Sequence, residues 1–178
     1  MKFTETKLKG AFVVEIEKRE DERGFFAWSF CQKEFEQHGL KSGVVQTNIS
    51  LNHRKGTLRG MHFQLVPHEE VKMVRCTRGA VYDVIIDLRK GSLTRKQWVG
   101  VELNEDNYKM LYIPEGFAHG YLTLKDRSDV SYLMTQFYAS GSESGVRYND
   151  PAFDIQWPKD APVTQLADKD RNWPDFKT

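Results

Sequence analysis

Residues 71–88 read VKMVRCTRGAVYDVIIDL, and this stretch decides the fold class. Two short runs, 71–77 and 80–88, alternate between inward and outward side chains at the period of two that is typical of β-strands. Turn-forming residues at 78–80 separate the runs. The stretch therefore predicts two consecutive strands.

Similar runs fill most of the chain. The other candidate strands are 11–17, 44–50, 57–64, 97–103, 109–114, 119–124 and 129–138. Turn residues stand between them, and the one predicted helix, 31–39, ends at Gly39. This pattern predicts an all-β sandwich or barrel. The Pro- and Asp-rich tail from Tyr148 onward is expected to wrap the surface of the barrel.

Composition excludes several classes of function. The chain has 178 residues, which suits one domain, and its net charge of +1 disfavours nucleic acid or an anionic membrane as a partner. No apolar run approaches the roughly 20 residues of a membrane helix, and the N-terminus lacks the apolar segment of a secretory signal. Cys31 and Cys76 are isolated in sequence. We therefore expect a cytoplasmic protein without disulfides.

The alternation also assigns polar side chains to the inside of the barrel. Asp83 shares a face with Val81 and Ile85, and Lys72 shares a face with Val74. The polar residues predicted to gather inside are His62, Lys72, Asp83, Tyr132 and Tyr138. Buried polar groups need partners, so such a cluster indicates a functional site more than a simple core.

His62 has two possible roles besides that of a structural histidine, metal ligand and general base. Metal-binding cupin barrels pair an HxH element with a later PxGxxH element, and 114–119 reads PEGFAH. The first element fails, however, because Gln64 replaces the second histidine. A nucleophilic site is also disfavoured, since no GxSxG elbow is present. A metal-free imidazole can act as a general base near neutral pH, and we prefer this role.

A number of motifs resemble those of the dTDP-4-dehydrorhamnose 3,5-epimerases and related nucleotide-sugar epimerases. They are RGMHFQ at 59–64, VKMVRCTRGAVYDVIIDLRKGSLT at 71–94, IPEGFAHGY at 113–121, YLMTQFY at 132–138, NDPAFDIQWP at 149–158 and DKDRNWP at 168–174. The resemblance implies that residues 1–178 form one cupin-like epimerase domain, a double-stranded β-helix or jelly roll. It also implies a homodimer, no metal or other cofactor, and a nucleoside-diphosphate 4-keto-6-deoxy sugar as substrate.

The resemblance further implies roles for individual residues. His62 would be the base, Asp170 its carboxylate partner, and Tyr132 the acid. Lys72 would stabilise negative charge on the keto oxygen. The residues that would bind or surround the substrate are Arg23, Gln46, Arg59, Asp83, His119 and Tyr138. The reaction implied is inversion at C3, C5 or both.

One geometric conflict arises within 57–64. Strict alternation puts Arg59 and His62 on opposite faces of the strand. Both can reach one site only if the strand is irregular between them, and Gly60 is the residue that would permit a bulge.

The sequence also departs from the family pattern. Glu70 stands where Gln or Ala is common, Leu133 where Lys is common, and Ala167 where Ser is common. These departures leave the nucleobase and sugar open. The alternatives are an epimerase or ketoisomerase that acts on another nucleotide-linked keto sugar, a metal-dependent cupin enzyme, and a non-catalytic sugar-binding barrel.

Overall fold

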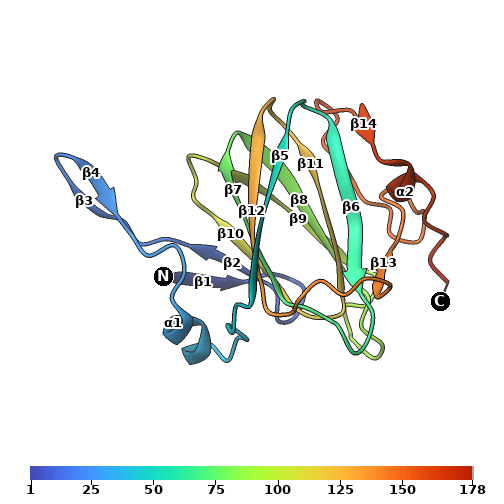
Figure 1. Cartoon of the computed structure of the whole chain (residues 1–178), viewed down its shortest axis with the longest axis horizontal. Coiled ribbons are helices and arrows are strands. Elements are labelled where there is room, and N and C mark those ends of the chain that lie inside the picture. Colours follow the sequence, from blue (N-terminus) through green and yellow to red (C-terminus); the bar gives the residue numbers. More distant parts are fainter. Residues whose placement is uncertain (178) are drawn as a thin grey trace.

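A computed structural model describes residues 1–177, and its architecture consists of two facing β-sheets (Figure 1). The first sheet has the strand order β1-β2-β10-β7-β12-β5. Its strands are β1 (Lys2–Glu5), β2 (Phe12–Glu15), β10 (Met110–Ile113), β7 (Lys72–Arg78), β12 (Ser128–Met134) and β5 (Gln46–Asn52). The order mixes strands distant in sequence, as expected for a jelly roll.

The second sheet has the order β13-β6-β11-β8-β9, and β14 pairs with β6 in parallel. Its strands are β13 (Glu143–Gly145), β6 (Thr57–Gln64), β11 (Phe117–Thr123), β8 (Ala80–Asp87), β9 (Trp98–Asn104) and β14 (Gln165–Leu166). The predicted consecutive strands β7 and β8 thus lie in different sheets, so the turn between them crosses the barrel rather than forming a hairpin.

The core between the sheets follows the predicted alternation. Val74 of β7 and Val81 and Ile85 of β8 belong to one buried inter-sheet cluster. Val84 and Ile86 point the other way, into a cluster on the outer face of the second sheet. Both faces of β8 are therefore buried, which explains its nearly continuous apolar sequence.

The outer faces are covered by the two ends of the chain. The helix α1 (Gln32–Gln37) packs Phe35 against Met73 and Tyr112 on the first sheet. The tail runs over the second sheet, where Phe153 is buried, and ends near the short helix α2 (Asp168–Arg171). The predicted wrapping of the tail is confirmed. Within residues 1–177, no helix has the length and apolar character that crossing a membrane requires.

A hairpin that the sequence pattern did not reveal projects from the barrel. It consists of β3 (Arg19–Asp21) and β4 (Gly24–Phe26), which pair only with each other. Figure 1 shows it extending away from both sheets, on the side opposite to the tail. All six of its strand residues are exposed.

A buried carboxylate organises the turn after β8. Asp87 is fully buried and accepts hydrogen bonds from Arg89 Nη2 at 2.7 Å, Ser92 Oγ at 2.6 Å and Thr94 Oγ1 at 2.7 Å. Burial by itself would raise the pKa of Asp87, but the hydrogen bonds from Arg89, Ser92 and Thr94 outweigh it and lower the pKa to about 2. The folded state therefore binds this proton more weakly than the unfolded chain does.

This difference predicts acid-sensitive stability. A depressed carboxyl pKa stabilises the fold above the unfolded value of 3.8, and the contribution disappears as pH falls toward the folded value. For a shift of this size the contribution is about 2 kcal/mol. Denaturant unfolding should show a lower free energy of unfolding for Asp87→Asn than for wild type at pH 7. This difference in free energy should shrink by that amount between about pH 4 and pH 2. Asp106→Asn, at an exposed carboxylate, is the control; a gap independent of pH would contradict the prediction.

Candidate active site

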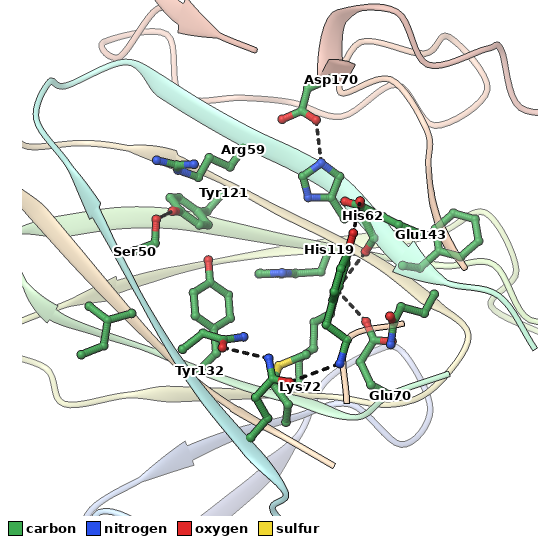
Figure 2. Close-up of a pocket in the computed structure, with 17 residues that line it drawn as sticks. Ser50, Arg59, His62, Glu70, Lys72, His119, Tyr121, Tyr132, Glu143 and Asp170 are labelled. Carbon is green, nitrogen blue, oxygen red and sulfur yellow. Dashed lines mark hydrogen bonds and ion pairs between the residues drawn. The ribbon is translucent and has the colours of Figure 1, made fainter. Parts of the chain in front are cut away.

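The polar side chains of the barrel meet in one cavity of about 410 Å³. The cavity lies between the two sheets, and Figure 2 shows the residues that line it. His62 on β6 and His119 on β11 belong to the second sheet, whereas Lys72 on β7 and Tyr132 on β12 belong to the first. The side chains of the two sheets therefore face each other across the cavity.

An irregularity in β6 brings Arg59 and His62 to the same cavity. His62 pairs with His119 and Arg59 pairs with Tyr121, so two residues of β6 oppose the single residue Gly120 on β11. Gly60 has φ +133°, and a Cβ atom there would lie 2.5 Å from Gly120 Cα. Only glycine fits at this contact. The structure thus resolves the conflict that strict alternation raised.

His62 forms a close pair with a carboxylate from the tail. Its Nε2 lies 2.6 Å from Asp170 Oδ1, and Asp170 Oδ2 accepts a hydrogen bond from Gly60 N at 3.2 Å. Burial raises the pKa of Asp170, but the hydrogen bond and charge of His62 outweigh this and lower the pKa below its usual range. Asp170 is therefore an ionised carboxylate that orients the imidazole and leaves Nδ1 for a substrate.

A second histidine and carboxylate pair lies deeper. His119 Nε2 is 3.0 Å from Asp83 Oδ2, and Asp83 is fully buried. Burial raises the pKa of Asp83 despite the opposing effects of His119 and Lys72. His119 lines the cavity, whereas Asp83 lies behind it and contributes no lining surface. The prediction that Asp83 lines the pocket is wrong; its contact is with His119.

Tyr132 stands across the cavity from His62. Its ring packs edge-on against His119, with ring centroids 6.1 Å apart. Burial raises the pKa of Tyr132 well above its ordinary value, and the neighbouring Tyr121 and Asp83 raise it further, while Arg59 lowers it. The phenol is therefore protonated at neutral pH and can serve as a proton donor.

Comparison with known proteins identifies the family. The dTDP-4-dehydrorhamnose 3,5-epimerase family matches residues 5–178. The chain belongs to this family. It is an isomerase, as the sequence motifs predicted.

Individual relatives cover nearly the whole chain. A dTDP-4-dehydrorhamnose 3,5-epimerase from Shigella flexneri is 43% identical over 99% of this chain and 96% of its own length. A Streptomyces niveus dTDP-4-dehydrorhamnose 3-epimerase is 36% identical over 92% of this chain and 79% of its own length. A crystal structure of the Legionella pneumophila epimerase with dTDP-4-keto-L-rhamnose is 36% identical, with a TM-score of 0.89 and 99% coverage of both chains. The predicted cupin-type jelly roll is thereby confirmed.

Most of the residues proposed from sequence for this epimerase site lie together. The cavity is lined by Gln46, Arg59, His62, Lys72, His119, Tyr132, Tyr138 and Asp170. Tyr138 reaches it from the loop after β12, because the strand ends at Met134 instead of continuing to 138. Among residues 1–177, no three His, Cys, Asp or Glu side chains converge as a metal site would require.

Arg23 does not reach the cavity of its own chain. It occupies the turn of the projecting hairpin, where its side chain is 84% exposed and pairs with Asp21 at 2.5 Å. Arg23 therefore does not line the cavity of its own chain, and its binding of the diphosphate stays a prediction. Sequence motifs carry no information on where a hairpin will point, so the pattern alone could not reveal this.

Several lining residues were not predicted, and some left a readable signal. Asn48 and Ser50 alternate with Gln46 along β5, and the same period-two argument would have placed them on its face. Tyr121 falls inside the recognised motif at 113–121, although no role was assigned to it. Glu143 comes from the short strand β13, which has no strong sequence signature.

Proposed function

We propose that this protein inverts C3 and C5 of dTDP-4-dehydro-6-deoxyglucose and so forms dTDP-4-dehydrorhamnose, with no cofactor. One observation carries the proposal: a His62–Asp170 pair and a protonated Tyr132 face each other from opposite sheets across one cavity. Inversion requires removal of a proton from one face of a sugar ring and delivery to the other. The Legionella relative, whose structure contains dTDP-4-keto-L-rhamnose, supports this choice of substrate.

The first step is proton removal by His62. Hydrogens on C3 and C5 are acidic because both carbons flank the C4 ketone. His62 accepts one of them and becomes an imidazolium, which the ionised Asp170 at 2.6 Å stabilises. The electron pair of the broken C–H bond moves into an enolate, whose negative charge lies on the C4 oxygen.

The second step is protonation from the opposite side. Lys72 is the cation that offsets the enolate charge, and its partly buried ammonium lines the cavity. Tyr132 donates its phenolic proton to the same carbon, which leaves a phenolate near Arg59. The imidazolium then loses its proton and the phenolate regains one before the next inversion begins.

Arg59 and Gln46 are proposed to bind the nucleotide portion. Arg59 lies at the exposed side of the cavity, where its Nε donates to Asn52 Oδ1 at 2.8 Å. Within residues 1–177 no carboxylate pairs with its guanidinium, so its charge is available for a diphosphate. Gln46, on β5 beside the cavity, can hydrogen-bond the nucleoside.

We propose that the protein is a homodimer and that Arg23 acts on the site of the partner. β5 is an open edge of the first sheet, and it carries Ile49, 81% exposed, and Leu51, 44% exposed. Phe26 on the projecting hairpin, at 64%, and Phe137 in the loop after β12, at 61%, are further exposed apolar side chains. Open edges and apolar patches of this kind are typical of interfaces. A dimer would let the projecting hairpin deliver Arg23 to a second cavity.

Isotope exchange tests the proposed reaction. In D2O, the wild-type protein should incorporate deuterium at C3 and C5 of dTDP-4-dehydro-6-deoxyglucose. NMR measures the incorporation at each carbon. His62→Ala should lower exchange at both carbons by roughly 100-fold or more, because one base serves both. His53→Ala, at an exposed histidine away from the cavity, is the control. No uptake by the wild type would indicate a sugar-binding protein, and uptake at C3 alone would indicate a 3-epimerase like the Streptomyces niveus relative.

Tyr132→Phe separates a catalytic phenol from a packing ring. If Tyr132 is the acid, His62 still removes the proton, so exchange with retained configuration persists while net epimerisation falls roughly 100-fold. If the hydroxyl only makes a structural hydrogen bond, the variant loses about 1 kcal/mol of stability and keeps its rate of epimerisation. Chiral analysis of the product together with thermal unfolding distinguishes the two. A folded variant with wild-type epimerisation would move the acid role elsewhere, with Tyr138 the next candidate.

Subunit mixing tests the proposed role of Arg23. Arg23→Ala and His62→Ala proteins should each be impaired alone at substrate concentrations below KM. If Arg23 acts across a dimer, each mixed dimer contains one complete site, so random mixing should restore about a quarter of wild-type activity. Arg19→Ala, on the same hairpin, replaces Arg23→Ala in the control mixture. No recovery in dimers shown by sedimentation to have exchanged subunits would contradict the proposal.

A further inference from the structure

The ammonium of Lys72 has two close oxygen contacts. Its Nζ donates a hydrogen bond to the backbone oxygen of His62 at 3.1 Å and forms an ion pair with Glu70 Oε1 at 3.0 Å. A lysine ammonium has three N–H donors, so a donor remains for another partner beside these contacts. Lys72 lines the cavity and its side chain is only 11% exposed, so the two contacts limit where the ammonium can lie.

Glu70 is bound to Lys72 more closely than to any other group in the described part of the chain. Its side chain is 3% exposed and also lines the cavity (Figure 2). Its second oxygen, Oε2, is buried and has no hydrogen-bond partner among residues 1–177. A buried carboxylate requires compensation, and Lys72 supplies it. The two side chains therefore depend on each other.

The backbone fixes the relative position of this pair. Glu70 and Lys72 are two residues apart, and both side chains line the cavity. Between them, Val71 N donates to Thr135 Oγ1 at 3.0 Å and is thereby tied to the segment after β12. Lys72 itself pairs with Met134 on one side and Ile113 on the other. The stem of Lys72 is thus rigid at its base, and Glu70 restrains its far end.

We propose that Glu70 is a positioning residue for epimerisation, holding the Lys72 ammonium so that one N–H points at the oxygen where the enolate charge develops. The inference rests on the proposed function. Lysine is a point charge on a flexible four-carbon stem, so its contribution to a transition state depends on being held in advance. Without Glu70, only the His62 carbonyl would restrain the ammonium. Because a carboxylate also offsets part of the lysine charge, the useful feature of Glu70 is its acceptor position.

Steady-state kinetics on dTDP-4-dehydro-6-deoxyglucose tests the positioning. Glu70→Ala should lower kcat by about 10- to 100-fold, the cost of a misplaced catalytic group, with KM changed less than about twofold. Glu70→Gln keeps an acceptor oxygen in place and should stay within about threefold of wild-type kcat. Glu69→Ala removes the neighbouring charge, which has no ion pair to Lys72, and should leave both constants unchanged.

A double-mutant cycle identifies Lys72 as the group through which Glu70 acts. In a Lys72→Met background, Glu70→Ala should lower kcat by less than about twofold further, because no ammonium remains to be positioned. An equal loss in both backgrounds would overturn the proposal. So would an unchanged kcat in Glu70→Ala, a rise in KM at constant kcat, or a Glu70→Gln variant as impaired as Glu70→Ala.

Thermal unfolding tests the pair without any substrate. Lys72→Met leaves a buried, uncompensated carboxylate and should lower Tm, and adding Glu70→Gln should recover part of that loss. Additive Tm changes would show that the two side chains are not coupled and would overturn the proposal. A wild-type protein inactive on the keto sugar would reject the proposed function instead, and the unfolding cycle would still decide whether the pair exists.

Discussion

The site depends on the close approach of two glycines between β6 and β11. Gly60 and Gly120 lie so near that a Cβ on either would clash with the backbone of the other strand. This contact permits β6 to carry one extra residue, which turns Arg59 and His62 toward the same cavity. The same segment donates Gly60 N to Asp170, so the partner of the base is fixed by the irregularity that orients the base. A regular strand here would put Arg59, the proposed diphosphate-binding residue, and His62, the proposed base, on opposite faces.

The two-sheet architecture supplies the second requirement, a base and an acid on opposite sides of the substrate. His62 and His119 come from one sheet, and Lys72 and Tyr132 come from the other. Neighbouring strands of a single sheet would present their side chains to the same face of a sugar ring. Facing sheets present them to both faces. In the proposed mechanism, the separation between proton removal by His62 and proton delivery by Tyr132 therefore follows from the fold, and side-chain flexibility is not needed to create it.

The period-two pattern predicted the inside of the barrel well because it reports a local property of each strand. Val81 and Ile85 pack inside, and Lys72 faces the cavity, as alternation requires. The pattern failed where position depends on distant parts of the chain. Asp83 was expected at the cavity surface, but the register of β8 against β11 sets Asp83 opposite Tyr121 and behind His119. Arg23 was assigned from its motif alone, and neither the motif nor alternation predicts the direction of a hairpin whose two strands pair with each other. Asp170 was found only through its motif, since its approach to His62 depends on the path of a tail with little regular structure.

The distribution of charge explains how a nucleotide sugar would be oriented. In the interior each basic side chain has a carboxylate partner: His62 has Asp170, His119 has Asp83, and Lys72 has Glu70. His62 must be neutral before it can accept a proton, so these pairs carry no net positive charge, and the interior offers little attraction to a diphosphate. Arg59 differs, because its Nε donates to the neutral amide of Asn52 and its side chain is exposed. An anionic diphosphate is therefore drawn to the open side of the cavity, and the uncharged keto sugar is left to occupy the interior between His62 and Tyr132. Reversed binding would place the two phosphates beside the ionised Asp170, whose negative charge would repel them.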